Sequence, residues 1–236
     1  MLELKGIQIT WCGHACFRIE HGGQRLYIDP FLKDNPACPA GEKTPKPAQA
    51  ALITHGHFDH MADAVTLAGQ GATLVGMFEL MQMFGEQGVA EKQRMGMNKG
   101  GTIEIAGVKA TMVHALHSCG AVSNGKPVYA GEAAGYVLEF SNGTRLYHSG
   151  DTEVFGDMAL IRELHQPQIA LLPIGGHFTM DPRRAALACK LLGVKHVIPM
   201  HFGTWPPLKG TPEELKPQLE GSDCEVVAIQ PGQTLR

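Results

Sequence analysis

The sequence lacks the features that mark secreted, membrane-spanning and duplex-binding proteins. Its six cysteines form no Cys-x-x-Cys pair and no regular spacing, which favours free thiols in a reducing cytosol. No apolar run approaches the roughly 18 residues of a membrane helix, and residues 1–11 lack the apolar core of a secretion signal. Lys and Arg number 20 against 23 Asp and Glu, so the basic excess of a nucleic-acid binder is missing. We expect a cytoplasmic protein with no membrane segment and no nucleic-acid partner.

Glycine and proline, in contrast, are abundant, with 29 and 15 residues among 236. Both residues interrupt helices and strands, so this excess over average usage argues against a plain helical bundle and favours a loop-rich α/β or all-β architecture. A single domain of this length buries roughly 70 to 75% of its unfolded surface and needs no disulfide. We expect residues 1–236 to form one domain.

Short runs rich in Val, Ile, Leu and Tyr, bounded by Gly, Pro, Asn or Asp, predict the strands. They lie near 3–11, 15–21, 24–29, 50–54, 72–76, 101–106, 108–115, 134–140, 144–148, 168–173, 195–200 and 224–229. The clearest helix covers 182–192, because Asp181 can cap it and Gly193 can end it. Other helices are expected at 60–69, 77–87 and 154–165, and from a capping box at Thr211 to before Gly221. Segments 33–47 and 118–132 are expected to be long loops, which in compact domains are often functional.

Two stretches of the chain resemble each other at a constant offset of 120 residues. Arg25-Leu26-Tyr27 recurs as Arg145-Leu146-Tyr147, Gly56-His57-Phe58 recurs as Gly176-His177-Phe178, and Gly23, Ala50 and Leu52 match Gly143, Ala170 and Leu172. Chance similarity between apolar strands is the alternative, but one shared register favours an ancient duplication. Two such halves would pack sheet against sheet with helices outside. The predicted fold is therefore an α/β, four-layer αββα sandwich whose strand-end loops meet at one edge.

The segment 53–60 concentrates ligand-type side chains at the end of an apolar strand. His55, His57, Asp59 and His60 form an H-x-H-x-D-H array within six residues. Burying so many polar groups without partners would cost a few kcal/mol for each group, and metal coordination supplies those partners. Imidazole and carboxylate suit zinc or another first-row ion, and the absence of cysteine argues against a closed structural zinc site. The alternative, a solvated loop that happens to be rich in histidine, is less economical.

The array resembles the signature of the metallo-β-lactamase superfamily, and later strand ends match the remaining positions of that family. His117 follows one strand, Asp151 lies in a Gly-Asp-Thr motif, and His201 follows another strand. The segments Trp11-Cys12-Gly13-His14 and Leu26-Tyr27-Ile28-Asp29-Pro30 further resemble a subgroup of uncharacterised metal-dependent hydrolases. That subgroup is similar to bacterial ascorbate-phosphate lactonase and to the phospholipase D that cleaves N-acyl phosphatidylethanolamines.

The resemblance implies a dinuclear hydrolase acting on an ester, lactone or phosphodiester bond of a small molecule. In the family pattern His55, His57 and His117 would hold one metal, Asp59, His60 and His201 would hold the second, and Asp151 would bridge both. Two divalent ions, most simply zinc, with manganese or iron as alternatives, would activate a water molecule. Relatives that reduce oxygen or nitric oxide carry Glu where this chain has His57, which favours hydrolysis. A nuclease of the same fold and a non-hydrolytic metal or redox module remain the alternatives.

Several residues keep more than one interpretation at this point. His177 and Asp59 are our two catalytic candidates. His177 could contact substrate or donate a proton, but it could also be a loop histidine bonded to backbone. His114 competes with His117 as ligand, since both lie near the end of one strand. Asp29, His148 and His14 could orient the ligands or merely cap turns, whereas Cys119 is expected to be a small buried residue. The substrate is open, and association into a homo-oligomer is possible.

Overall fold

The computed structural model describes residues 2–123 and 125–236 and contains two seven-stranded mixed sheets. The first has the order β16 (Thr234–Leu235), β1 (Gln8–Trp11), β2 (Phe17–His21), β3 (Gln24–Ile28), β4 (Ala50–Leu52), β5 (Thr73–Met77), β6 (Arg94–Met97). The second has the order β15 (Glu225–Val226), β14 (His196–Met200), β13 (Ile169–Pro173), β12 (Arg145–His148), β11 (Ala134–Phe140), β8 (Val108–His114), β7 (Thr102–Ile105). A separate hairpin joins β9 (Gly120–Ser123) and β10 (Lys126–Tyr129).

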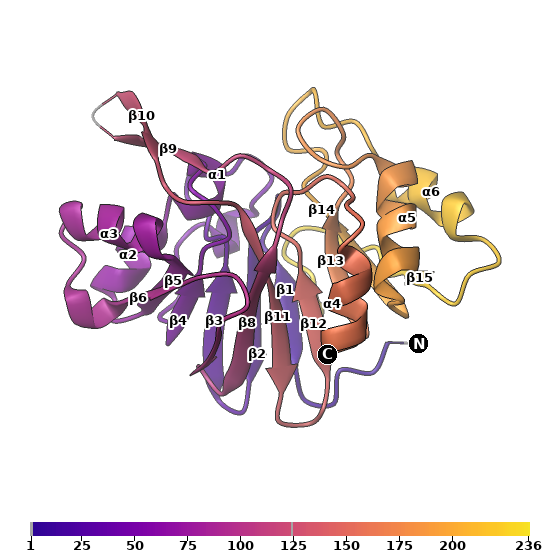
Figure 1. Cartoon of the computed structure of the whole chain (residues 1–236), viewed down its shortest axis with the longest axis horizontal. Coiled ribbons are helices and arrows are strands. Elements are labelled where there is room, and N and C mark those ends of the chain that lie inside the picture. The colour runs from indigo at the N-terminus through magenta and orange to yellow at the C-terminus, as the bar shows by residue number, and fades with distance from the viewer. Residues whose placement is uncertain (1, 124) are drawn as a thin grey trace.

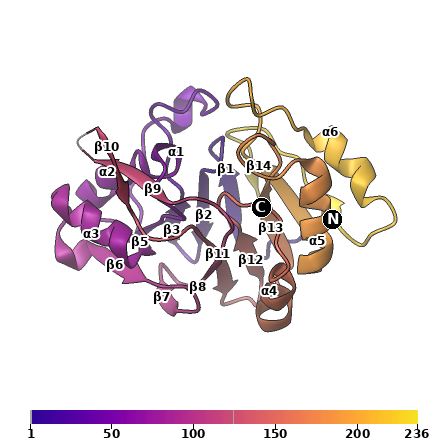
Figure 2. The same ribbon diagram turned by 45° about the horizontal axis from the view of Figure 1, so that its top comes forward.

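The helices lie on the two outer sides of this pair of sheets (Figures 1 and 2). One side carries α1 (Phe58–Met61), α2 (Ala64–Gly69) and α3 (Phe78–Glu86), and the other carries α4 (Met158–His165), α5 (Pro182–Leu192) and α6 (Pro212–Leu215). Single 3-10 turns occupy Ala40–Glu42, Glu91–Gln93 and Lys216–Leu219. No helix among the described residues is long and apolar enough to cross a bilayer. The predicted α/β sandwich with four layers is confirmed.

Alternation along β13 explains why the second sheet is buried on both faces. Ile169 and Leu171 belong to the core that lies between the two sheets. Ala170 and Leu172 instead join the core formed with α4 and α5. Successive strand residues point to opposite faces, so a fully apolar strand is the pattern expected between a sheet and a helical layer.

The helix signals in the sequence correspond to caps in the structure. The Asp181 carboxylate accepts a hydrogen bond from the backbone N–H of Arg184 at 2.8 Å, and Gly193 ends α5 with φ of 63°. Thr211 and Glu214 form the predicted capping box of α6. The predicted helix at 60–69 was wrong in detail, since the chain forms α1 and α2 with a break between them.

The hairpin of β9 and β10 corrects the prediction of an irregular loop over residues 118–132. Val122 and Tyr129 are among its exposed side chains, and only Ala121 is fully buried. Strands without a buried apolar face leave little periodic signal in a sequence. The short edge strands β6 and β16 were missed as well, and the strand expected at 224–229 is reduced to β15.

The internal repeat is present in the structure, with one correction to its register. Gln49 N donates to Arg25 O at 2.9 Å, and Gln168 N donates to Arg145 O at 2.9 Å. The donors, Gln49 and Gln168, are therefore offset by 119 residues, whereas the acceptors, Arg25 and Arg145, are offset by 120 residues. The second half is thus one residue shorter between its paired strands. The sequence matches of Ala50 with Ala170 and Leu52 with Leu172 are not structural equivalences. Counted from these strands, His57 corresponds to Gly176 and not to His177.

Candidate metal centre

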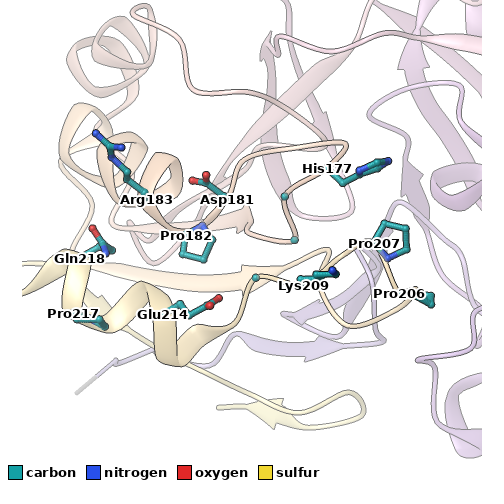
Figure 3. A pocket seen from close by; sticks show the side chains of 13 residues that line it. His177, Asp181, Pro182, Arg183, Pro206, Pro207, Lys209, Glu214, Pro217 and Gln218 are labelled. Atoms are coloured by element: carbon teal, nitrogen blue, oxygen red, sulfur yellow. The ribbon is translucent and has the colours of Figure 1, made fainter.

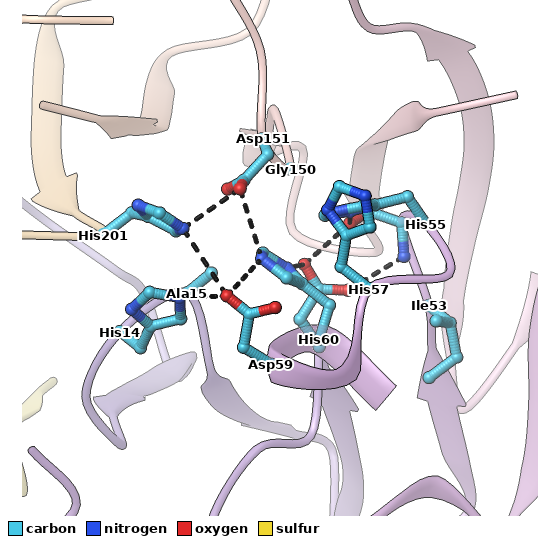
Figure 4. A network of polar contacts seen from close by, with 12 residues as sticks. His14, Ala15, Ile53, His55, His57, Asp59, His60, Gly150, Asp151 and His201 are labelled. Atoms are coloured by element: carbon cyan, nitrogen blue, oxygen red, sulfur yellow. Dashed lines mark hydrogen bonds and ion pairs between the residues drawn. The ribbon is translucent and has the colours of Figure 1, made fainter. Parts of the chain in front are cut away.

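The metal-ligand candidates meet at one edge of the two sheets, where several strands end (Figure 4). His55 and His57 lie between β4 and α1, and Asp59 and His60 lie in α1. The remaining candidates follow the ends of β8, β12 and β14 and are His117, Asp151 and His201, respectively. Because β12, β13 and β14 are parallel, their carboxyl ends lie at the same edge, where open α/β sheets bind ligands.

One carboxylate oxygen, Asp151 Oδ2, lies at the centre of the cluster. It is 3.0 Å from His201 Nε2, 3.4 Å from His60 Nε2 and 3.7 Å from His117 Nε2. Two ligands bonded to one ion at about 2.1 Å lie roughly 3 to 4 Å apart, which these distances match. Asp151 contacts histidines from both halves of the cluster and can therefore serve both sides of it.

The other candidates divide into two groups around this carboxylate. His55 Nε2 lies 2.9 Å from His57 Nδ1, and both belong with His117 to one group whose ligand atoms lie within 4.8 Å of one another. Asp59 Oδ2 lies 3.8 Å from His60 Nε2 and 4.0 Å from His201 Nε2, in a second group. A third group, His55, His60 and Asp151, overlaps both, so the described residues form adjoining groups in which a cation could be held.

Within the described part of the chain, several buried ring and carboxylate atoms of the cluster have no hydrogen-bond partner. These are His60 Nε2, both ring nitrogens of His201 and Asp151 Oδ1. An unpaired buried polar atom costs about 1 to 3 kcal/mol, and several at one place are rarely tolerated without a ligand. A bound cation would pair most of these atoms at once, so the residues present fit a metal site.

Burial sets the protonation of the first group. It lowers the pKa of His57 and His117, and it lowers the pKa of His55 well below its usual value, with His60 adding to the effect. Neutral imidazoles keep a free lone pair, which metal binding requires. For His60, burial opposes protonation, but Asp151 and Asp29 prevail and raise its pKa. A proton on His60 occupies the place that a metal would take.

His14 is the functional residue that sequence reasoning left undecided between a turn and the site. It is fully buried, its Nε2 lies 2.9 Å from Asp59 Oδ2, and its Nδ1 lies 2.9 Å from Thr204 Oγ1. Burial and His201 lower the pKa of His14 to about 4. For Asp59, burial would raise the pKa, but the hydrogen bond from His14 prevails and the pKa is lowered to about 2. Near pH 7 a neutral His14 therefore donates to an ionised Asp59. His14 could also serve as a metal ligand. The distance from its Nε2 to Asp59 Oδ2, however, is that of a hydrogen bond.

Asp29 supports the ligand candidates from behind. Its carboxylate accepts hydrogen bonds from Thr54 N and Thr54 Oγ1, both at 2.8 Å, and from His60 Nδ1 at 2.7 Å. The same Thr54 hydroxyl lies 3.0 Å from His55 Nδ1. The buried carboxylate of Asp29 thus fixes Nδ1 of His60. Through Thr54 it also fixes the strand end that carries His55. Such support is typical of metal-ligating histidines.

Backbone strain is concentrated at this edge. His14, Asp29 and His201 have φ values of 57°, 50° and 56°, in the left-handed region that non-glycine residues rarely adopt. Each such residue costs of order 1 kcal/mol or more, and strain of this kind clusters at functional sites. His148 holds the edge in another way, because its ring bonds the backbone of Ala15 and Gly150 and not a ligand side chain.

The structure places His117, and not His114, in the cluster. His114 is exposed on the other side of the strand end, where its Nδ1 lies 2.9 Å from Lys99 Nζ. Cys119 is buried and its thiol contacts the carbonyl of Ala130. The expectation that Cys119 is a small buried residue agrees with this position.

His177 is not brought together with the cluster. Its side chain is exposed, its ring packs edge-on against Phe178, and it lines a separate groove of about 1040 Å³. Figure 3 shows the ring at the rim of that groove, directed away from Asp181 and Glu214. This position agrees with the corrected register, in which Gly176 is the counterpart of His57.

The family is decided by comparison with known proteins. The Beta-lactamase superfamily domain matches residues 24–202. A UPF0173 metal-dependent hydrolase from Koribacter versatilis is 50% identical over 238 residues, covering 99% of each chain. The chain belongs to this family within the β-lactamase superfamily. Membership confirms the predicted resemblance to metal-dependent hydrolases.

One solved structure supports this membership, and a second shares the fold. Igni18, a metallo hydrolase from Ignicoccus hospitalis, shares 33% identity with this UPF0173 chain at a TM-score of 0.85, over 97% of both chains. An isothiocyanate hydrolase from Delia radicum gut bacteria has a TM-score of 0.71 at 16% identity, covering 97% of this chain and 98% of its own. The second likeness establishes a shared fold alone.

Proposed function

We propose that this chain is a dinuclear metal-dependent hydrolase that cleaves an ester, lactone or phosphodiester bond of a small-molecule substrate. The carrying observation is Asp151 Oδ2, which lies within 3.7 Å of histidines from both ligand groups. Beside it lie buried ring nitrogens that have no hydrogen-bond partner among the residues that the structure describes. His55, His57 and His117 would hold one ion, Asp59, His60 and His201 the other, and Asp151 both. We also propose that residues 1–236 form one hydrolase domain, because segments from both sheets supply ligands.

Two divalent ions, when bound there, supply a nucleophile from water near neutral pH and polarise the bond to be cleaved. The chain's own residues do the rest of the work. His14 holds the Asp59 carboxylate ionised and in place, and Asp29 fixes the ring of His60. We assign Asp59 the catalytic role of positioning the reacting groups. A proton-donating role for His177 stays a prediction, and it would require movement of the loop that carries this side chain.

Zinc is the ion that this donor set favours, because imidazole and carboxylate without thiolate suit zinc in open sites. Manganese and iron remain alternatives that metal analysis separates. The purified protein should be stripped with a chelator, reloaded with each ion, and assayed on an aryl ester, a lactone, an aryl phosphodiester and a thioester. We expect two ions per chain and metal-dependent turnover of at least one substrate. Two bound ions with no turnover of any of the four would contradict the proposal.

His14 offers a test of how the second ion is held. Replacing His14 with alanine removes the hydrogen bond to Asp59, so we expect one of the two ions to bind about 10- to 100-fold more weakly. Titration with a competing chelator measures this affinity. His177→Ala is the matched control, because His177 also has a left-handed backbone, with φ of 57°, but lies outside the cluster. Equal metal affinities in the two variants would show that His14 does not position Asp59.

A further inference from the structure

A pocket of about 580 Å³ opens beside the ligand candidates and is lined mainly by apolar groups. Besides members of the metal cluster, it is lined by Gly56, Phe58, Met61, Ser118, Gly120, Val122, Phe178 and Trp205. A cavity of this size accommodates a small organic molecule. Its walls therefore determine which part of a substrate can lie next to the reacting bond.

Three aromatic side chains line this pocket, and we call them together the aromatic wall. Phe58 begins α1, Phe178 follows β13 and Trp205 follows β14. Phe58 is 64% exposed and Phe178 is 57% exposed, and the rings of Phe58 and Trp205 lie 6.0 Å apart. A single exposed apolar side chain needs no explanation. Three aromatic residues from distant segments at the mouth of one pocket indicate a surface that a ligand covers.

The pocket offers no positive side chain to the part of a substrate that lies away from the metals. Among the described residues, none of those that line it is a lysine or an arginine. Lys99 is paired with Glu132 at 2.6 Å, and Arg183 and Lys209 line the groove of His177 instead. A carboxylate or phosphate held against the aromatic wall would lose water without gaining a partner, which is costly.

We infer that this hydrolase takes uncharged esters or lactones whose apolar acyl group lies against the aromatic wall. The inference rests on the proposed function and narrows its substrate class. Each methylene buried against such a wall is worth about a threefold to fourfold gain in binding. The specificity constant kcat/KM should therefore rise along a series of longer acyl chains until the pocket is full.

The test for activity uses the metal-loaded protein with phenyl acetate, phenyl butyrate, phenyl hexanoate and monophenyl adipate. We expect kcat/KM to rise about threefold to fourfold per methylene from acetate to hexanoate. Monophenyl adipate, which has the chain length of hexanoate but ends in a carboxylate, should react at least about tenfold more slowly. A flat series, or an adipate ester that reacts as fast as the hexanoate, would overturn the inference.

A positive charge placed on the wall should weaken this preference. In Phe178→Lys we expect the ratio of kcat/KM for hexanoate over adipate to fall by about tenfold. Phe78→Lys is the matched control, since Phe78 is a 54% exposed phenylalanine on α3 that does not line the pocket. The ratio should stay unchanged in the control. An equal ratio in both variants would place the acyl group elsewhere.

Binding of 2-acetonaphthone, an uncharged ketone that cannot be hydrolysed, gives a measurement independent of turnover. Its effect on tryptophan fluorescence reports binding near Trp205, and Phe178→Lys should weaken that binding about tenfold while Phe78→Lys leaves it unchanged. Ketone binding of this kind without turnover of any ester, lactone or phosphodiester would reject the proposed function and support the apolar pocket. Turnover without any effect of Phe178→Lys on ketone binding would reject the pocket assignment alone.

Discussion

Asp151→Ala is expected to remove at least one metal ion from each chain and to lower kcat/KM by on the order of a thousandfold or more. The reason is the position of one oxygen, since Asp151 Oδ2 lies within 3.7 Å of three histidines. The carboxylate is almost fully buried, and although burial opposes ionisation, His201 and His60 hold its pKa well below the usual value. Elemental analysis and circular dichroism of the purified variant measure metal content and folding together.

His177→Ala is the control for this substitution. It removes a titratable side chain at the same edge, but from a position that lines the neighbouring groove. We expect the His177→Ala variant to retain both ions. Its turnover should decrease only if His177 takes part in proton transfer. A folded Asp151→Ala variant that keeps two ions would reject the bridging assignment. Loss of metal from His177→Ala would show that this histidine is a ligand after all.

Most of the candidate metal cluster could be predicted from the sequence because the candidate ligands follow apolar strands. The array from His55 to His60 is continuous, and Asp151 and His201 each follow a strand that the residue pattern predicts correctly. Carboxyl ends of parallel strands share one edge, so the convergence of these side chains could be expected. The choice between His114 and His117 required the structure, since both flank the same strand end.

Features that depend on contacts between distant segments could not be predicted. His14 contacts Asp59 across 45 residues, and Trp205 contacts Phe58 across a far longer stretch. Neither contact has a local sequence pattern, because His14 and Trp205 by themselves resemble turn or surface residues. The predicted equivalence of His177 with His57 failed for a similar reason, because a one-residue difference between the two halves shifts His177 out of register with His57.

Asp29→Ala is the substitution for which we expect the largest loss of stability. Asp29 is fully buried and accepts three hydrogen bonds, two from Thr54 and one from His60. Truncation leaves these donors unpaired and removes a negative charge that favours protonated His60. Breaking a buried pair of this kind costs about 3 to 5 kcal/mol. Urea denaturation of the metal-free protein should show this decrease in the free energy of unfolding.

Two further variants separate the hydrogen bonds of Asp29 from its backbone conformation. The φ of Asp29 is 50°, which asparagine tolerates better than alanine, so Asp29→Asn should lose less stability than Asp29→Ala. Asp34→Ala removes a carboxylate from an exposed position nearby and should leave the denaturation midpoint unchanged. If Asp29→Ala unfolds at the same urea concentration as Asp34→Ala, the contacts of Asp29 do not stabilise the strand end. Because Asp29 fixes the ring of His60 through Nδ1, a destabilised variant should also bind the second metal more weakly.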